Sequence, residues 1–195
     1  IWFQGCSIRC SGCISADTWG TEKGRVSIDE VMKVISTWLD TAEGITISGG
    51  EPFEQPEALE LLLTQLRTRT NIDILVYSGH SFEKISPWVE KYNGLIDALI
   101  SDPYEKKSPQ TLALRGSDNQ RLHCLTALGK KRFHQFDRLL KPSDKTFDIM
   151  FEEEGVTWLA GIPRRDDLRR LKIFLEQEGH IATITQEGQS KNRMA

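Results

Sequence analysis

The sequence predicts an α/β fold, in which a partial (β/α) barrel of parallel strands with helices outside is followed by a C-terminal ββαβ extension. Short apolar runs alternate with amphipathic stretches over residues 1–100, which is the order of βαβ units with right-handed crossovers. Such units form a full or partial barrel or an open sheet, and the strands countable here fall short of a full barrel. In each arrangement, sites gather at the C-terminal ends of the strands.

The N-terminal part of the chain contains the first predicted strand and helix. Residues 1–3 are strand-like, and we expect the start of this strand to be missing from the sequence. Ser27 and Glu30 have capping-box spacing, which predicts the N-terminus of a helix. The apolar residues that follow at helical spacing are expected to face inward, and they are Val31, Val34, Ile35, Trp38 and Leu39.

Three further strands and two further helices complete the predicted βαβ region. The strands are residues 45–47, 72–77 and 95–100. A helix after Pro56 has leucines at helical spacing, and another helix is expected from Phe82 to Tyr92. This alternation places a polar loop after each of four strands.

Beyond residue 121 the pattern predicts smaller elements. Two short helices are expected at residues 122–128 and 133–140. The ββαβ unit consists of residues 147–151, 156–160, 166–177 and 181–185, with Gly155 at the hairpin turn. We therefore expect a core over residues 1–121, an extension over 122–185 and a polar tail over 186–195.

Composition favours an intracellular enzyme over a nucleic-acid-binding or membrane protein. Hydrophobic residues make up 38% of the chain and charged residues 27%, which allows a compact core. The net charge of −3 offers no basic surface for nucleic acid. No signal peptide or transmembrane run is recognisable, and free thiols fit a reducing compartment, so we expect a cytoplasmic location.

Three of the four cysteines, Cys6, Cys10 and Cys13, lie in one short loop with the spacing C-x3-C-x2-C. The fourth, Cys124, lies more than 100 residues further along the chain. Three thiolates can hold three irons of a cubane cluster and leave the fourth iron open to a substrate or cofactor. The spacing therefore indicates an iron–sulfur cluster with one open iron.

A zinc site and a set of unrelated cysteines remain alternatives at this point. Structural zinc usually takes four ligands in two pairs, and the loop supplies three. None of the four histidines has metal-ligand spacing, so we interpret them as surface or structural residues. We interpret Cys124 as a small apolar residue of the predicted helix at 122–128.

Polar loops also follow the next three predicted strands, at residues 48–53, 78–80 and 101–104. Gly49 and Gly50 let the backbone approach a ligand closely, and Glu51 offers an acceptor for an ammonium group. Tight turns are the alternative explanation, above all for Ser78 and Gly79. The four loops are expected to converge on one rim.

A C-x3-C-x2-C loop after the first strand, followed by Gly49-Gly50-Glu51-Pro52 after the second, resembles the radical S-adenosylmethionine superfamily. Within it, the chain resembles the small activating proteins of glycyl-radical enzymes, above all those of anaerobic ribonucleotide reductases. The supporting stretches are Gln4–Cys6, Cys10–Cys13 with Trp19, Tyr77–Gly79, Ile96–Asp97 with Asp102, and Arg115–Arg121. The resemblance covers residues 1 to about 121, and it departs from the usual pattern at Gly12, where most members have an aromatic residue.

The resemblance implies two cofactors, a [4Fe–4S] cluster and S-adenosylmethionine. Cys6, Cys10 and Cys13 would ligate the cluster, and S-adenosylmethionine would chelate its fourth iron. The residues implied to hold S-adenosylmethionine are Gly49, Gly50, Glu51 and Pro52 for the methionyl ammonium, Ser78 and Asp102 for the carboxylate, the ribose or a bound cation, and Asn119 for the adenosyl group.

The resemblance also implies a reaction. One electron from a flavodoxin- or ferredoxin-type donor would cleave S-adenosylmethionine to a 5′-deoxyadenosyl radical, which would abstract hydrogen from a glycine of a partner enzyme. The chemistry belongs to the cofactors, so no side chain need act as a general acid or base. Two other functions stay open, a radical enzyme acting on a small molecule, nucleotide or peptide, and a cluster-bearing module without turnover.

Overall fold

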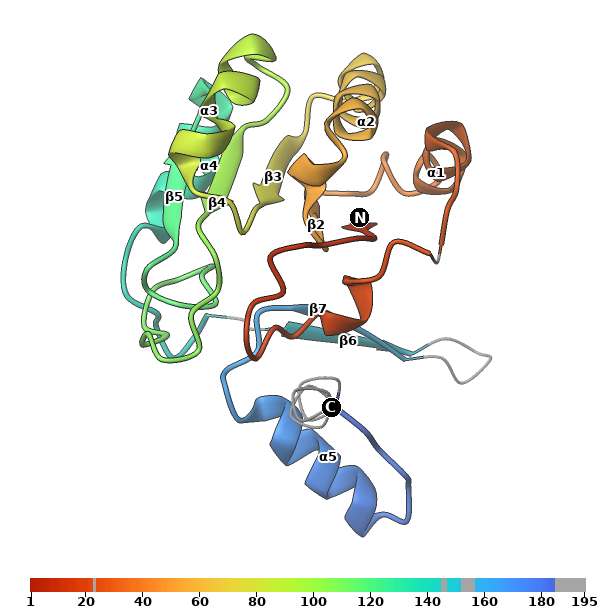
Figure 1. The fold of residues 1–195 in the computed structure, drawn as a ribbon, viewed down its shortest axis with the longest axis vertical. Helices are drawn as coiled ribbons and strands as arrows, with labels where there is room; N and C mark the ends of the chain where they lie inside the picture. Colours follow the sequence, from red (N-terminus) through yellow and green to blue (C-terminus); the bar gives the residue numbers. More distant parts are fainter. Residues whose placement is uncertain (23, 145–146, 152–156, 185–195) are drawn as a thin grey trace.

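The computed structural model describes residues 1–22, 24–144, 147–151 and 157–184, and its centre is a five-stranded sheet of order β1-β2-β3-β4-β5 (Figure 1). The strands are β1 (Trp2–Phe3), β2 (Gly44–Gly49), β3 (Asp73–Tyr77), β4 (Ala98–Ser101) and β5 (Arg121–Cys124). β1 to β4 are parallel, and β5 runs antiparallel to β4. The predicted α/β fold of mostly parallel strands in a partial barrel is therefore confirmed, with one antiparallel strand added at the edge.

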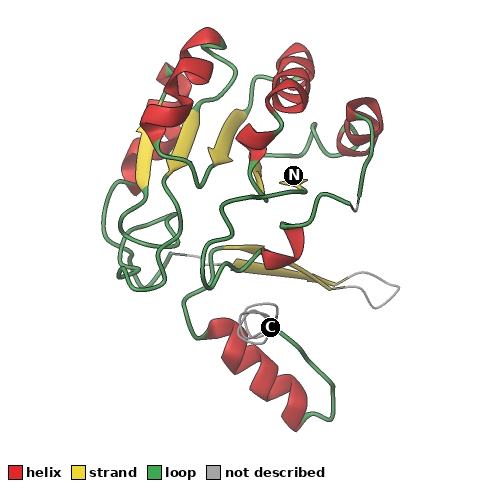
Figure 2. Ribbon diagram, in the orientation of Figure 1, coloured by secondary structure: helices red, strands yellow, loops and turns green. Residues whose placement is uncertain are grey.

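Helices cover both faces of this sheet (Figure 2). They are α1 (Ile28–Ile35), α2 (Pro56–Arg69), α3 (Phe82–Lys91) and α4 (Ala127–Phe133). Because side chains alternate along a strand, Ile74 and Val76 pack with α1, α2 and α3, whereas Leu75 packs with Phe133 of α4. The leucine stripe predicted for α2 is buried against the first of these faces.

The inward face predicted for α1 is wrong at two positions. Val34 is 56% exposed and Trp38 is 62% exposed, whereas Met32 is buried. The capping box of Ser27 and Glu30 is present, so the helix begins as predicted. α1 ends at Ile35, and Trp38 therefore lies beyond the helix, where its spacing no longer places it on the helical face.

The helix predicted at residues 122–128 is also wrong, because residues 121–124 form β5. Four residues of β5 pair with β4, from Arg121 opposite Ser101 to Cys124 opposite Ala98. α4 begins only after Thr126, whose side chain accepts a hydrogen bond from the Gly129 N–H. The helix predicted at 133–140 is reduced to a single 3₁₀ turn, η3 (His134–Phe136). β5 thus belongs to the main sheet and α4 packs against that sheet, although both were expected to be part of the extension that begins at residue 122.

A hairpin and a helix form the C-terminal extension. β6 (Phe147–Phe151) and β7 (Thr157–Gly161) are antiparallel, and α5 (Asp167–Gln177) follows as predicted. The predicted turn at Gly155 and the tail at 186–195 lie outside the described residues. Residues 181–184 form no strand. In the view of Figure 1, the hairpin lies beside η1 (Ala16–Thr18), and α5 lies beyond the hairpin, away from the four helices of the main sheet.

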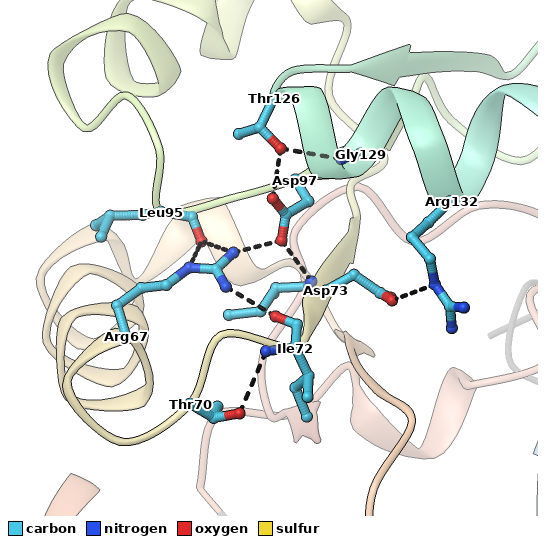
Figure 3. A network of polar contacts seen from close by, with 10 residues as sticks. Arg67, Thr70, Ile72, Asp73, Leu95, Asp97, Thr126, Gly129 and Arg132 are labelled. Atoms are coloured by element: carbon cyan, nitrogen blue, oxygen red, sulfur yellow. Dashed lines mark hydrogen bonds and ion pairs between the residues drawn. The ribbon is translucent and has the colours of Figure 1, made fainter.

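A polar network joins the N-terminal ends of β3 and β4 (Figure 3). Arg67 of α2 donates to Asp97 at 2.5 Å and to the Leu95 carbonyl oxygen. Asp97, which is 3% exposed, also accepts hydrogen bonds from the Ile74 N–H and the Thr126 hydroxyl. This end of the sheet is opposite to the rim that carries the polar loops. The network therefore stabilises the strands at the end that is remote from the site.

No helix among the residues described here is both long and apolar enough to cross a membrane.

Candidate cluster and cofactor site

The cysteine loop leaves β1 and is closed by backbone hydrogen bonds near its base. The Gly5 N–H donates to the Thr18 carbonyl oxygen at 2.7 Å, and the Cys6 N–H donates to that of Trp19 at 3.2 Å. The Gln4 side chain adds a hydrogen bond to the Gly20 carbonyl oxygen at 2.8 Å. These hydrogen bonds therefore hold the two ends of the loop side by side.

The three loop cysteines form no disulfide bonds, are partly exposed and lie within electrostatic range of one another. The Cys13 N–H donates to the Cys10 carbonyl oxygen at 3.1 Å, which folds the loop back on itself. Burial raises the pKa of both Cys10 and Cys13. Hydrogen bonds oppose this effect on the pKa, from the Tyr104 backbone to Cys10 and from the Ser15 backbone and the Trp19 side chain to Cys13. Such donors to sulfur also stabilise a cluster thiolate.

The donor set fits a cluster better than a single ion. Among the described residues, no three cysteine, histidine or carboxylate side chains surround a point where one metal ion could be held. A cubane spreads its thiolates over separate corners, so three separate thiols on one loop match its requirement. Cys124 lies in β5 and packs beside the apolar cluster of Leu75 and Phe133, as expected for a small apolar residue.

The glycine pair after β2 brings the cysteine loop against the sheet. Gly49 has φ of +104°, and a Cβ atom there would lie 2.4 Å from the Phe3 carbonyl oxygen. A Cβ on Gly50 would lie 2.1 Å from the Gly5 carbonyl oxygen. Only glycine fits such backbone contacts. The sequence predicted that this pair would let the backbone approach a ligand. In the structure, the close approach is to the backbone of Phe3 and Gly5.

Glu51 is fully buried and joins the loops after β2 and β3. Its carboxylate accepts hydrogen bonds from the Ser78 hydroxyl at 2.9 Å, the Gly79 N–H at 2.7 Å and the Phe53 N–H at 3.0 Å. Burial raises the pKa of Glu51, although these three donors act in the opposite direction. Pro52 is also buried and begins η2 (Pro52–Glu54). The carboxylate is thus committed to the protein itself.

Asp102 occupies a strained position after β4. Its φ is +83°, which is uncommon for a residue other than glycine, and its N–H donates to the His80 carbonyl oxygen at 2.8 Å. The carboxylate accepts two hydrogen bonds from Arg121, at 2.7 and 3.1 Å, and one from the Ser101 hydroxyl. Burial would raise the pKa of Asp102, but these hydrogen bonds outweigh it and the pKa is lowered. His80 in turn donates its backbone N–H to Ser78.

Asn119 carries a buried acceptor that is left open. Its Nδ2 donates to the Pro103 carbonyl oxygen at 2.8 Å, whereas its Oδ1 is buried without a hydrogen-bond partner. An unpaired buried acceptor is costly, and an N–H donor such as an adenine amine would satisfy it. The residues present therefore fit S-adenosylmethionine at this point.

Tyr104 is a site residue to which the sequence assigned no role, although it lies in a predicted rim loop. Its backbone donates to the Cys10 sulfur, and its ring lies beside two glycines. A Cβ on Gly12 would be 3.6 Å from this ring, and a Cβ on Gly116 would be 3.3 Å from it. Gly12 has φ of +81°, and the side chains of Tyr104 and Lys106 from the loop after β4 lie beside it. The sequence places Tyr104 in the polar loop at residues 101–104 that follows β4, which was the signal for a site residue there.

The predicted rim therefore exists. The cysteine loop contacts the loop after β2 through Gly5 and Gly50, and it contacts the loop after β4 through Cys10 and Tyr104. The loops after β2 and β3 meet at Glu51. The ligand roles of the individual residues stay predictions.

A cavity of about 630 Å³ lies between the extension and the outer side of the cysteine loop. Its walls come from loop residues 14–18 and from β7, α5 and residues 182–184. None of the cysteines or predicted S-adenosylmethionine contacts lines it. The extension thus lies beside the site and does not enclose it within the described part of the chain.

Comparison with known proteins identifies the chemistry of this region. Residues 1–123 match the family model described as a 4Fe-4S single cluster domain. The cofactor prediction is thereby confirmed, with the C-x3-C-x2-C loop as the carrier of the cluster. The matched segment extends into β5 as far as residue 123, in agreement with the place of β5 in the main sheet.

Relatives of known activity cover most of the chain. The anaerobic ribonucleoside-triphosphate reductase-activating protein of Enterobacteria phage T4 is 31% identical, over 63% of this chain and 80% of that protein. The pyruvate formate-lyase-activating enzyme of Clostridium pasteurianum is 29% identical, over 70% of this chain and 53% of that protein. The pyruvate formate-lyase 1-activating enzyme of Escherichia coli K12 is 39% identical, over 92% of this chain and 88% of that protein. The chain therefore belongs to the radical S-adenosylmethionine activating enzymes of glycyl-radical enzymes, with a single 4Fe–4S cluster domain.

Proposed function

We propose that this chain activates an anaerobic ribonucleotide reductase by removing a hydrogen atom from a glycine of that enzyme. The observation that carries the proposal is the loop of three cysteines, for which the described residues supply no further cysteine, histidine or carboxylate that would complete a metal site. The phage relative, by its name, activates an anaerobic ribonucleoside-triphosphate reductase. The reducing cytoplasm is the compartment in which such thiols persist.

Each rim residue has a role in this proposal. Cys6, Cys10 and Cys13 hold the cluster, and the backbone from Gly49 to Pro52 binds the methionyl ammonium. Glu51 shapes that loop, because its carboxylate already binds Ser78 and Gly79. Asn119 accepts from the adenine amine through its open Oδ1. Ser78 and Asp102 stand near the methionyl carboxylate and ribose, and Arg121 holds the Asp102 carboxylate in place.

When bound, the cluster and S-adenosylmethionine supply one-electron radical chemistry that ends in hydrogen abstraction. The chain itself binds, orients and keeps water from the reacting groups. It needs no proton carrier, in agreement with the commitment of Glu51 and Asp102 to internal hydrogen bonds. A small flavodoxin or ferredoxin is the proposed electron donor, since the reaction takes one electron at low potential.

Pyruvate formate-lyase is the second candidate target. The names of the Escherichia coli and Clostridium relatives favour it, and the former covers 92% of this chain. A small-molecule substrate has less support, because the larger cavity described here excludes the rim residues. Both protein targets would present a glycine to the same rim.

The proposal predicts a glycyl radical on a protein partner. The reconstituted chain, S-adenosylmethionine and a one-electron donor are mixed without oxygen with either candidate enzyme, and the radical is counted by electron paramagnetic resonance. We expect the glycyl doublet on the ribonucleotide reductase, with 5′-deoxyadenosine released in matching amount. A doublet on pyruvate formate-lyase alone would transfer the assignment to the second target. Release of 5′-deoxyadenosine with no doublet on either enzyme would contradict the activase proposal.

A further inference from the structure

The carboxylate of Glu54 holds one end of the cysteine loop. Glu54 ends η2, directly after the glycine-rich segment. Its oxygens accept the Ser7 backbone N–H, at 2.9 Å to Oε2 and 3.2 Å to Oε1, and they also accept the Ser7 hydroxyl. Ser7 is the neighbour of Cys6, so this contact places a carboxylate one residue away from a cluster thiolate. The two residues are 47 positions apart in the chain.

The Glu54 side chain is partly shielded, and on its far side it faces His80, which lies next to Lys84. It is 27% exposed, and its Oε1 lies 3.8 Å from the His80 Nε2. The Lys84 ammonium lies 3.1 Å from the His80 Nδ1. These residues line a small cavity of about 370 Å³ together with Phe53, Ile85 and Trp88. Glu54 therefore lies between a polar pocket and the cysteine loop.

Other contacts already hold the loop in position without charge. The Gln55 side chain donates to the Gln4 carbonyl oxygen at 2.8 Å, and the Glu51 N–H donates to that of Gly5 at 2.8 Å. A neutral side chain at position 54 could accept the Ser7 N–H equally well. A carboxylate beside a cluster with three thiolates adds like charge and costs free energy. Positioning alone thus leaves the charge of Glu54 unexplained.

A nearby negative charge has one direct effect on an iron–sulfur cluster. Reduction adds an electron, so a carboxylate next to the ligands disfavours the reduced form and lowers the reduction potential. A low potential makes the reduced cluster a stronger one-electron donor, which the proposed chemistry requires. Partial shielding from solvent preserves this electrostatic effect.

We propose that Glu54 is a positioning residue that fixes the Ser7–Cys6 end of the cysteine loop and, through its charge, keeps the potential of the cluster low. The proposal rests on the cluster-binding part of the proposed function and is independent of the protein target. Glu54 acts through Ser7, its hydrogen-bond partner in the loop, and not as a ligand of the cluster.

The test is a potentiometric titration of the reconstituted chain, followed by electron paramagnetic resonance. Glu54→Gln keeps an acceptor for Ser7 and removes the charge. We therefore expect the reduction potential of the cluster to rise by up to ~59 mV, which corresponds to a tenfold change in the one-electron reduction equilibrium. Glu57→Gln is the matched control, because it removes an exposed charge from the first turn of α2, and its potential should equal that of the wild type. Ser7→Ala retains the charge and should also leave the potential unchanged.

Hydrogen exchange of the Ser7 amide reports the positioning role separately. Glu54→Ala removes the acceptor, and we expect the Ser7 amide to exchange at least about tenfold faster in this variant than in Glu54→Gln. A Glu54→Gln potential no higher than that of Glu57→Gln, or a Ser7→Ala shift of the same size, would overturn the electrostatic part. Equal Ser7 exchange in all variants would overturn the positioning part. A wild-type chain that binds no iron would refute the proposed function as well, whereas a normal cluster with equal potentials would refute this inference alone.

Discussion

At the scale of single residues, the site depends on thiols that belong to one loop. Cys6, Cys10 and Cys13 form no disulfide bonds and are partly exposed, and the backbone of Tyr104 and the side chain of Trp19 donate to two of the sulfurs. Cys124 is also free, but it lies in β5 and packs against the apolar cluster on the α4 side. Position in the fold thus separates three cluster ligands from one packing residue.

This separation gives a prediction for cysteine variants. Cys6→Ala, Cys10→Ala and Cys13→Ala should each abolish reductive cleavage of S-adenosylmethionine, because two thiolates no longer hold the cluster with one open iron. Cys124→Ala is the control and should retain about four irons per chain and the cleavage activity. Iron content and 5′-deoxyadenosine release, measured together, check both statements. Loss of cleavage in the Cys124 variant would show that this thiol has a role in the chemistry.

Several important contacts of single residues had no signal in the sequence. Glu54 and Ser7 are 47 residues apart, and neither belongs to a recognisable motif. Glu51 was expected to offer its carboxylate to an ammonium group, yet three protein donors already bind it. Such pairings depend on which loops meet in space, and the sequence pattern shows only that each loop follows a strand.

At the scale of elements, regular patterns predicted regular structure. The leucine stripe of α2 and the capping box of α1 have strong local causes, and both occur where expected. β5 is short and was mistaken for a helix, because its pairing with β4 supplies the hydrogen bonds that define it as a strand. For α1, the helix ends at Ile35, so Trp38 lies beyond the helical face, and Val34 is exposed within the helix.

The network below the sheet should make a large contribution to stability. Asp97→Ala leaves the Arg67 guanidinium, which is 18% exposed, without its ion-pair partner. Removal of one member of a buried pair costs about 3–5 kcal/mol, which for a chain of this size corresponds to a fall in Tm of roughly 6–20 °C. Thermal unfolding of the reconstituted protein, followed by circular dichroism, measures this change.

The control for this prediction is an ion pair near the surface. Glu176→Gln removes a partner of Lys172 at 3.8 Å on α5, and its effect on unfolding should be about 0–1 kcal/mol. If Asp97→Ala lowers Tm no more than Glu176→Gln does, the network is not the support of the strands described above.

At the scale of the whole molecule, one end of the sheet carries the stabilising ion pairs and the other end carries the candidate site. Ion pairs join the strands at the N-terminal end, and loops from four parallel strands meet at the other end. The sequence predicted this arrangement because βαβ order determines the end at which the loops emerge. The position of the extension could not be predicted from the sequence, because its packing beside residues 14–18 depends on contacts between distant segments.

The central claim is that the three-cysteine cluster has an open iron that binds S-adenosylmethionine. The most direct measurement is the electron paramagnetic resonance spectrum of the reduced, reconstituted chain, recorded with and without S-adenosylmethionine. We expect the g values of the cluster signal to change on addition, because a new ligand reaches the fourth iron. A spectrum that is identical in both samples, at concentrations where S-adenosylmethionine is present in large excess, would contradict this account.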